Sequence, residues 1–258
     1  MEFNFSGKVC LVTGAGAGMG KATAIQYARN GAKVGINDLT AEICADTLEA
    51  IRAVGGQCFG VYGDISDPAV SEALTDQAME RYGRIDALAN VAGVVIPGSI
   101  ISTTQADIDK TLRINVKGSI LTTQAAVRYM KEQEEGGAVV MVGSSAGLLG
   151  VSDRVAYSAS KGAIIAVTRA IAVDLLHTKV RVNCICPGPV NSPSMEARFQ
   201  ATPGLREKFL AGALNDRLGE AEELAQAILF ASCGEMGYLN GAIISVDGGL
   251  TCSQGIKK

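Results

Sequence analysis

The chain has 258 residues, of which 48% are hydrophobic and 19% charged, and its formal net charge is −3. This composition supports a large buried core and excludes a disordered chain, which needs low hydrophobicity and high net charge. A weakly acidic chain lacks the basic footprint of nucleic-acid-binding proteins. No run of about 18 uncharged apolar residues predicts a membrane span, and residues 1–8 do not resemble a secretion signal. We therefore expect a cytoplasmic protein.

The cysteines and the single histidine argue against a bound metal. Zinc sites need three or four Cys, His or carboxylate ligands at close spacing. This chain has one histidine, His177, no C-x-x-C pair, and seven scattered cysteines at positions 10, 44, 58, 184, 186, 233 and 252. We expect reduced thiols, as in a cytoplasmic protein, and no metal site.

Short apolar runs alternate with amphipathic stretches along almost the whole chain. The predicted strands are 8–13, 33–37, 57–62, 85–90, 138–142, 180–186 and 243–246, and the predicted helices are 18–30, 40–54, 67–82, 105–132, 154–176 and 220–233. Strands separated by helices pair in parallel, because each connection crosses a face of the sheet. We predict one doubly wound α/β domain over residues 1–258, with a seven-stranded parallel sheet flanked by helices on both faces.

The first predicted strand runs into a glycine-rich turn, Gly14-Ala-Gly-Ala-Gly18-Met19-Gly20, and a helical pattern follows at once. Glycine lets backbone N–H groups approach an anion closely, and a helix N-terminus adds partial positive charge. The spacing, G-x-x-x-G-x-G, predicts a cradle for a pyrophosphate. Tight packing of the helix on the strand is the alternative interpretation.

An acidic residue, Asp38, directly follows the second predicted strand. Asp38 stands twenty residues after Gly18, where an acidic side chain can accept hydrogen bonds from both hydroxyls of an adenosine ribose. Its charge repels a 2′-phosphate, and the next residues, Leu39 and Thr40, supply no cation to offset it. The sequence predicts NAD rather than NADP. The alternative is that Asp38 only caps a helix.

Four polar residues suggest acid–base chemistry. Tyr157 and Lys161 stand four apart in a helical pattern and so share one face. A phenol has a pKa of about 10, and a neighbouring cation lowers it. Ser144, just after the fifth predicted strand, can hold a substrate oxygen beside that phenol. Asn115 interrupts a helical pattern, which indicates a local bend or a bound water. A solvent-exposed helix face is the alternative for Asn115 and for the Tyr157–Lys161 pair.

One segment interrupts the alternation of strands and helices. After Pro187-Gly188-Pro189, the helical pattern resumes only at Glu220. Doubly wound folds bind ligands beyond the carboxyl ends of their strands, and long loops in compact domains are commonly functional. We interpret residues 188–218 as a lid over substrate. A passive surface insertion is the alternative.

Together these motifs resemble the short-chain dehydrogenase/reductase family, in its compact NAD-preferring branch, from Lys8 to about Gly249. The resemblance implies a Rossmann fold and a catalytic tetrad of Asn115, Ser144, Tyr157 and Lys161. It implies that NAD is held by Gly14, Gly18, Met19, Gly20, Asp38, Asp64, Ile65, Asn90, Ala92, Gly93, Tyr157, Lys161, Pro187, Gly188, Val190 and Ser192. The chain departs from the family pattern at Val91, where a second asparagine is usual, and at Ser192, where threonine is commoner.

The resemblance also implies the reaction. An NAD(H)-dependent oxidoreductase of this family interconverts a secondary alcohol and a ketone by hydride transfer, with Tyr157 as general acid or base. Ser144 would orient the substrate oxygen, Lys161 would hold the nicotinamide ribose and lower the pKa of Tyr157, and Asn115 would anchor a water. The predicted helix 154–176 is apolar on more than one face, so a partner subunit can cover one of them. The resemblance implies a homotetramer.

The substrate is predicted from two arginines. Arg154 precedes Tyr157 by three residues and Arg198 lies in the segment 188–218, and a guanidinium can grip a carboxylate with two hydrogen bonds. The stretch 182–194 resembles type-2 hydroxybutyrate and deoxy-sugar-acid dehydrogenases, which implies a small hydroxycarboxylate or sugar acid. The alternative is a hydrophobic alcohol, such as a hydroxysteroid or cyclic alcohol, held by the apolar residues Met195, Phe199, Phe209, Leu210 and Leu214.

Two other functions use the same fold. A catalytically silent NAD-binding sensor is possible in principle, since fold alone does not fix function, but a sensor has no need of the four tetrad residues. Sugar-nucleotide epimerases usually carry a longer carboxyl-terminal substrate domain than this length provides. The sequence favours the dehydrogenase over both.

Overall fold

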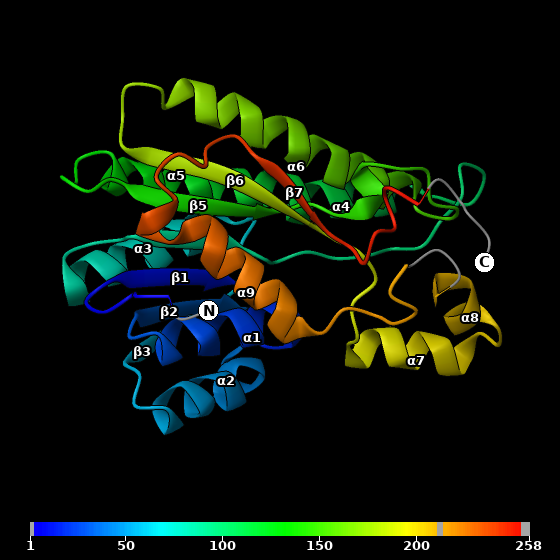
Figure 1. The fold of residues 1–258 in the computed structure, drawn as a ribbon, viewed down its shortest axis with the longest axis horizontal. Coiled ribbons are helices and arrows are strands. Elements are labelled where there is room, and N and C mark those ends of the chain that lie inside the picture. Colours follow the sequence, from blue (N-terminus) through cyan, green and yellow to red (C-terminus); the bar gives the residue numbers. More distant parts are fainter. Residues whose placement is uncertain (1–2, 211–213, 254–258) are drawn as a thin grey trace.

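The computed structural model describes residues 3–210 and 214–253. Its strands form one parallel sheet in the order β3-β2-β1-β4-β5-β6-β7 (Figure 1). The strands are β1 (Val9–Thr13), β2 (Lys33–Asp38), β3 (Cys58–Tyr62), β4 (Ala87–Asn90), β5 (Gly137–Val142), β6 (Val180–Pro187) and β7 (Ile243–Val246). The predicted doubly wound Rossmann fold, with seven parallel strands, is confirmed.

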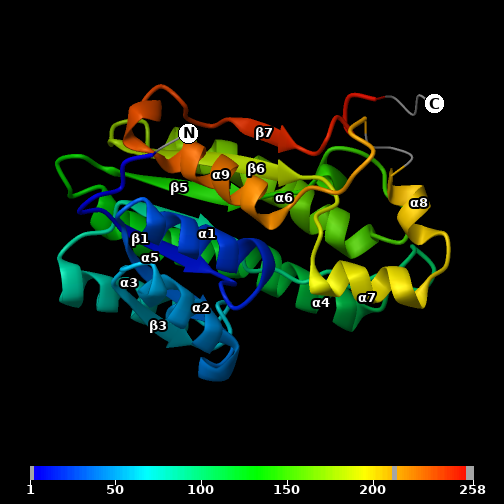
Figure 2. The same ribbon diagram turned by 60° about the horizontal axis from the view of Figure 1, so that its bottom comes forward.

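Helices cover both faces of this sheet. One face packs against α1, α2 and α9, which Figure 2 brings forward, and the other against α3, α5 and α6. The helices of these layers are α1 (Gly18–Arg29), α2 (Ala41–Ala53), α3 (Pro68–Tyr82), α5 (Ser119–Met130), α6 (Val155–Asp174) and α9 (Ala221–Ser232), and α4 (Gln105–Leu112) lies against α6. Each strand therefore needs apolar side chains on both faces, which is why the strands read as continuous apolar runs. In β1, Cys10 and Val12 enter one core while Val9 and Leu11 enter the other.

The predicted helix 105–132 is not continuous, and that expectation is corrected. Helix α4 begins in a capping box formed by Thr104 and Asp107, and then gives way to a π-helical turn, Arg113–Gly118, before α5 continues to Met130. A π turn holds one residue more than an α turn, so it shifts the helix face beyond it. Its physical cause is the Asn115 side chain, which is hydrogen-bonded to the segment after β4 and to α6.

The segment 188–218 contains two short helices that the periodicity did not predict: α7 (Pro193–Ala201) and α8 (Leu205–Leu210). The Ser192 Oγ accepts a hydrogen bond from the Met195 N–H, and Pro193 stands in the first turn. That pairing of cap and proline is a recognised helix start, so the sequence did carry a signal for α7. Both helices lie at one end of the molecule, outside the layers that cover the sheet (Figure 1).

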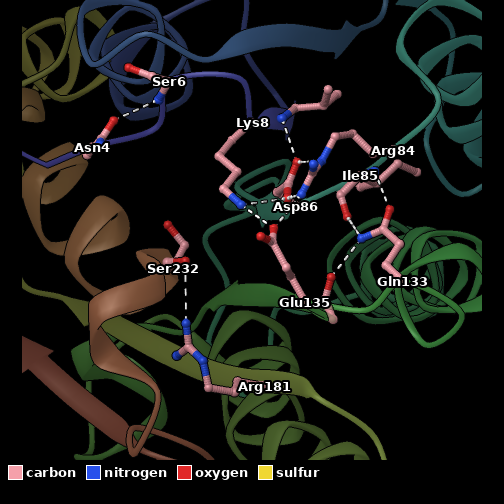
Figure 3. Close-up of polar contacts among 12 residues, drawn as sticks. Asn4, Ser6, Lys8, Arg84, Ile85, Asp86, Gln133, Glu135, Arg181 and Ser232 are labelled. Carbon is pink, nitrogen blue, oxygen red and sulfur yellow. Dashed lines mark hydrogen bonds and ion pairs between the residues drawn. The ribbon is translucent and has the colours of Figure 1, made fainter.

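Charged side chains form hydrogen bonds and ion pairs at the end of the sheet where the strands begin (Figure 3). Asp86 accepts a hydrogen bond from the Val9 N–H at 2.8 Å and another from the Arg84 Nε at 2.8 Å. Glu135 pairs with both Arg84 and Lys8. These contacts join the starts of β1 and β4 to the segment before β5.

Arg181 fixes the end of helix α9 against β6 (Figure 3). Its guanidinium donates to the carbonyl of Cys233 at 2.8 Å and to that of Leu239 at 3.0 Å. The last carbonyls of a helix have no partner within the helix, so a cation there satisfies them and complements the helix dipole. Among the described residues, no helix has both the length and the apolar run needed to cross a membrane.

Candidate active site

A cavity of about 790 Å³ runs along the edge where the strands end, from the turns after β2 and β3 to those after β5 and β6. Most of the sequence-predicted site residues line it: Gly14, Met19, Gly20, Asp38, Asp64, Ile65, Ala92, Gly93, Ser144, Arg154, Tyr157, Lys161, Pro187, Gly188, Val190 and Ser192. The cavity lies where doubly wound folds bind ligands, because the loops after adjacent parallel strands meet at this edge.

Three predicted residues, Gly18, Asn90 and Asn115, are not among the residues that line the cavity. Asn90 is 3% exposed and its amide donates to the Thr123 Oγ1 at 2.9 Å, so in this structure it joins β4 to α5. Gly18 begins α1 with a φ of 52°, a left-handed conformation that favours glycine. The side chain of Arg198, on α7, lies outside the described residues.

The glycine turn after β1 brings three backbone segments very close together. A Cβ on Gly14 would lie 2.7 Å from the Ala92 Cα, and one on Gly20 would lie 2.0 Å from the Gly14 carbonyl oxygen. The packing interpretation of these glycines is therefore correct, and it is compatible with the cradle. Ala17 caps α1 without a side-chain oxygen, and the first turn contains no acidic residue. The N-terminus of α1 consequently offers the cavity N–H groups and partial positive charge, which suit a pyrophosphate.

Asp38 ends β2 at the cavity wall. Its Oδ2 accepts a hydrogen bond from the Gly16 N–H at 2.9 Å, and its Oδ1 accepts one from the Leu39 N–H at 2.8 Å. The residue that caps α2 is Thr40, whose hydroxyl faces the Ile43 N–H, so the interpretation of Asp38 as a mere helix cap is wrong. The glycine turn thus donates a hydrogen bond to the Asp38 carboxylate, and Asp38 also lines the cavity. That position suits a ribose next to the anion cradle.

Tyr157, Lys161 and Ser144 line the far part of the same cavity. The Lys161 Nζ lies 5.7 Å from the centre of the Tyr157 ring and donates to the Val142 carbonyl at 2.8 Å. Lys161 is 5% exposed, so the hydrogen bond to Val142 holds its ammonium group in a buried position beside the Tyr157 ring. Gly147 makes this packing possible, because a Cβ there would lie 2.8 Å from the Lys161 carbonyl carbon.

Asn115 explains the π turn. Its Oδ1 accepts from the Val94 N–H at 2.8 Å, and its Nδ2 donates to the Val94 carbonyl and the Ser160 Oγ, both at 3.0 Å. The residue is 1% exposed, so the interpretation as a solvent-exposed face is wrong and the predicted bend is confirmed. The Asn115 amide joins the segment after β4 to α6, which carries Tyr157 and Lys161.

Asp64 follows β3 and lines the end of the cavity away from Tyr157. Burial alone raises the pKa of this carboxyl, but hydrogen bonds from Ser66 and Arg113 outweigh it and lower the pKa to about 2. The group is therefore ionised at every pH at which the protein is expected to work.

The wall beside Tyr157 was largely missed by sequence reasoning. It combines the polar residues Ser152, Asp153 and Arg154 with the apolar residues Val94, Val95, Leu149, Val151, Met195, Leu205 and Leu250. Arg154 is 8% exposed, and its Nη1 donates to the Asp153 carbonyl at 2.6 Å. Of the five apolar residues singled out in the segment 188–218, only Met195 lines the cavity, and the side chain of Phe209 lies outside the described residues. Leu250 comes from near the carboxyl end, where no periodicity signalled it.

One cavity thus joins an anion cradle at a helix N-terminus to a phenol beside an ammonium group. The residues present fit a bound dinucleotide: the closest approaches of the cradle are made by glycines that a side chain would block, and carboxylates line the cavity on the β2–β3 side. This is the layout of an oxidoreductase that uses a dinucleotide cofactor.

Comparison with known proteins gives the family. A family model described as enoyl-(acyl carrier protein) reductase matches residues 14–251. An uncharacterized oxidoreductase of Thermotoga maritima is 45% identical over 251 residues, covering 96% of this chain and 99% of that protein. The (2S)-[(R)-hydroxy(phenyl)methyl]succinyl-CoA dehydrogenase subunit BbsD of Thauera aromatica is 34% identical, covering 94% and 96%. The crystal structure of levodione reductase superposes with a TM-score of 0.91 at 31% identity, covering 96% and 99%.

The chain therefore belongs to the short-chain dehydrogenase/reductase family. It is an oxidoreductase of the kind that interconverts secondary alcohols and ketones of small molecules with a nicotinamide cofactor, NAD or NADP.

Proposed function

We propose that this protein is an NAD(H)-dependent dehydrogenase/reductase in which Tyr157 moves the proton of the substrate oxygen. The observation that carries the proposal is that Tyr157, Lys161 and Ser144 line one cavity with the glycine turn and Asp38. A nicotinamide cofactor, when bound, supplies the hydride acceptor or donor. The glycine turn and Asp38 would hold its pyrophosphate and adenosine ribose.

The protein's own groups handle the proton. The Lys161 ammonium lies 5.7 Å from the centre of the Tyr157 ring. The Tyr157 hydroxyl would give a proton to a ketone oxygen during reduction and take one from an alcohol during oxidation. Ser144 would hold that oxygen beside the phenol. Both N–H groups of the Asn115 amide are engaged, with the Val94 carbonyl and the Ser160 Oγ, so a water anchored at this residue would donate to one of its oxygens.

Two features of the wall beside Tyr157 bear on the substrate. The buried Arg154 favours a small hydroxycarboxylate or sugar acid, whose carboxylate it can pair with. The apolar residues favour a hydrophobic secondary alcohol, such as a hydroxysteroid or cyclic alcohol. We propose the hydroxycarboxylate as the first candidate and the uncharged alcohol as the second.

Turnover of a substrate panel with NAD separates the two candidates. With 3-hydroxyacids, sugar acids, hydroxysteroids and cyclic alcohols, NADH absorbance is expected to rise for the acids. Arg154→Gln is expected to raise KM for acids about tenfold or more, because it removes a charge-assisted hydrogen bond, while KM for uncharged alcohols stays unchanged. Arg206→Gln, on α8, is a control outside the cavity. Activity confined to uncharged compounds, equal in Arg154→Gln, would eliminate the acid.

The homotetramer is part of the proposal. Apolar side chains remain exposed along α4, α5 and α6, with Ile108, Ile120 and Val155 each 38% exposed. A helix that is apolar on two sides is stable when one side packs on its own sheet and the other packs on a partner subunit. Light scattering at micromolar concentration is expected to give four times the chain mass, and a monomer would contradict the proposal. We also propose a cytoplasmic location, which the seven free cysteines favour.

A further inference from the structure

Two cysteines of β6 lie directly behind the wall of the cavity. Cys184 and Cys186 are two residues apart in this strand, so their side chains point to the same face of the sheet. Their Sγ atoms lie 3.8 Å apart, and both residues are fully buried. The next residue, Pro187, lines the cavity, as do Gly143 and Ser144 after the neighbouring strand β5. The proposed reaction uses neither thiol.

Gly143 stands between the two sulfurs and the cavity. A Cβ on this residue would lie 2.7 Å from the Cys186 Sγ and 2.9 Å from the Cys184 Sγ. Since Gly143 also lines the cavity, one residue separates the dithiol from the space where ligands bind. An atom that bridged the two sulfurs on this side would push Gly143. It would also move the next residue, Ser144, which lines the cavity together with Tyr157.

The surroundings of Cys186 favour a thiolate. The S–H of Cys184 donates to Cys186 and lowers the pKa of the Cys186 thiol. Burial opposes this effect, while the Ser144 backbone N–H and the Lys161 charge lower the pKa further. The thiolate is the form of cysteine that attacks electrophiles and binds metals. An inert buried thiol shows the opposite shift, since burial raises the pKa of Cys44 to about 11.

The spacing of the sulfurs suits a bridging atom better than a direct disulfide. Residues i and i+2 of a strand stand about 6.6 Å apart, close to the upper limit, about 6.8 Å, of the Cα separations found in disulfides. By contrast, two sulfurs that are each about 2.3 Å from a tetrahedral ion lie about 3.8 Å apart, which is the separation of Cys184 and Cys186. Zinc takes three or four protein ligands, whereas a trivalent organic arsenical is complete with two sulfurs and its own carbon.

We propose that Cys184 and Cys186 form a dithiol site for trivalent arsenicals, and that filling this site displaces Ser144 and stops turnover. In water the arsenical carries two hydroxyl groups. Two As–S bonds form and two As–O bonds break, the thiol protons leave with the hydroxyls as two water molecules, and arsenic stays trivalent. The capture of the arsenical does not depend on the proposed function, whereas the loss of turnover does.

The probe is phenylarsine oxide, and its uptake by the whole protein is measured by intact mass. The native protein is expected to take up one phenylarsine group per chain. Cys184→Ala and Cys186→Ala are each expected to bind it about 10²-fold more weakly or worse, because the second As–S bond is an intramolecular step that a single thiol cannot make. Cys252→Ala is the matched control, since Cys252 is an exposed thiol whose Sγ donates to the Gly249 carbonyl, and it is expected to keep the native uptake.

Peptide mapping of the native protein tests the same site without any substitution. After treatment with the arsenical and alkylation in denaturant, Cys184 and Cys186 are expected to be protected together, and Cys252 to be alkylated. The loaded protein is expected to lose most of its NAD-dependent turnover. A dithiol such as dimercaptopropanol should remove the arsenical and restore turnover, and a monothiol at equal concentration should not.

The outcomes separate this inference from the proposed function. Absence of the adduct, equal uptake by Cys184→Ala, or protection of a different pair of cysteines would overturn the dithiol site. A loaded protein with unchanged turnover would overturn the displacement of Ser144. A native protein that turns over no alcohol would contradict the proposed function, and the uptake and the peptide map would still measure the site.

Discussion

Tyr157→Phe is expected to lower kcat by about 10²–10⁴-fold, the usual contribution of general acid–base catalysis, and to leave NAD binding intact. The phenol oxygen is the only atom removed, and the ring that packs near the Lys161 ammonium is retained. The affinity for NAD is measured by calorimetry, and kcat is measured by NADH absorbance at saturating substrate.

Tyr129→Phe is the matched control. The Tyr129 hydroxyl, on α5, donates to Asp76 at 2.7 Å outside the cavity lining, so its loss is expected to leave kcat unchanged. A Tyr157→Phe variant with near-normal kcat would show that another group moves the proton. A native protein that binds NAD and turns over nothing in the panel would instead fit the sensor considered from the sequence.

Asp38→Asn is expected to change cofactor selectivity more than any other single charge. The native protein should prefer NAD over NADP by on the order of 10²-fold, because juxtaposed like charges cost several kcal/mol. Asparagine can keep the hydrogen bond from the Gly16 N–H, which lies 2.9 Å from the Asp38 Oδ2, and it loses the one from the Leu39 N–H. The variant therefore removes the charge and one local hydrogen bond. Its kcat/KM for NADP is expected to rise tenfold or more.

Asp46→Asn controls for the change in net charge. The Asp46 side chain is 84% exposed and faces only Lys21, at 3.9 Å, among its ion-pair partners in the described residues. The ratio of kcat/KM for NAD to that for NADP should be unaffected in this control. Equal use of the two cofactors by the native protein would refute the assignment of NAD.

The sheet and most helices could be predicted because their signals are local. Apolar runs such as Val139–Val142 are required by burial on both faces, and caps such as Asp67 before Pro68 fix where helices begin. The glycine turn was also accessible, since strand, glycines and helix are contiguous. The structure adds that Gly14 and Gly20 also allow backbone segments to pack more closely than a side chain would permit.

The features that sequence reasoning missed depend on contacts between residues far apart in the chain. The π turn arises because the Asn115 amide bonds Val94 and Ser160, which a helical pattern does not encode. Asn90, predicted at the cofactor, is not among the cavity-lining residues, and its amide donates to partners on α5. The cavity wall likewise brings Leu149 to Leu250 across the fold. The residues with acid–base chemistry, such as Ser144 and Tyr157, were recognised from short local motifs, whereas apolar wall residues such as Leu149 and Leu250 carry no such motif.

The segment 188–218, which contains α7 and α8, begins and ends beside one short parallel β-bridge. Val190 bridges Gly219, and the Asn191 N–H donates to the Gly219 carbonyl at 2.7 Å. The free-energy cost of closing a loop between fixed ends rises slowly with its length, by about 0.6 kcal/mol for each doubling. Evolution can thus lengthen, shorten or exchange this insert while the sheet and the residues Ser144, Tyr157 and Lys161 stay unchanged, so new substrate preferences can arise on an old scaffold.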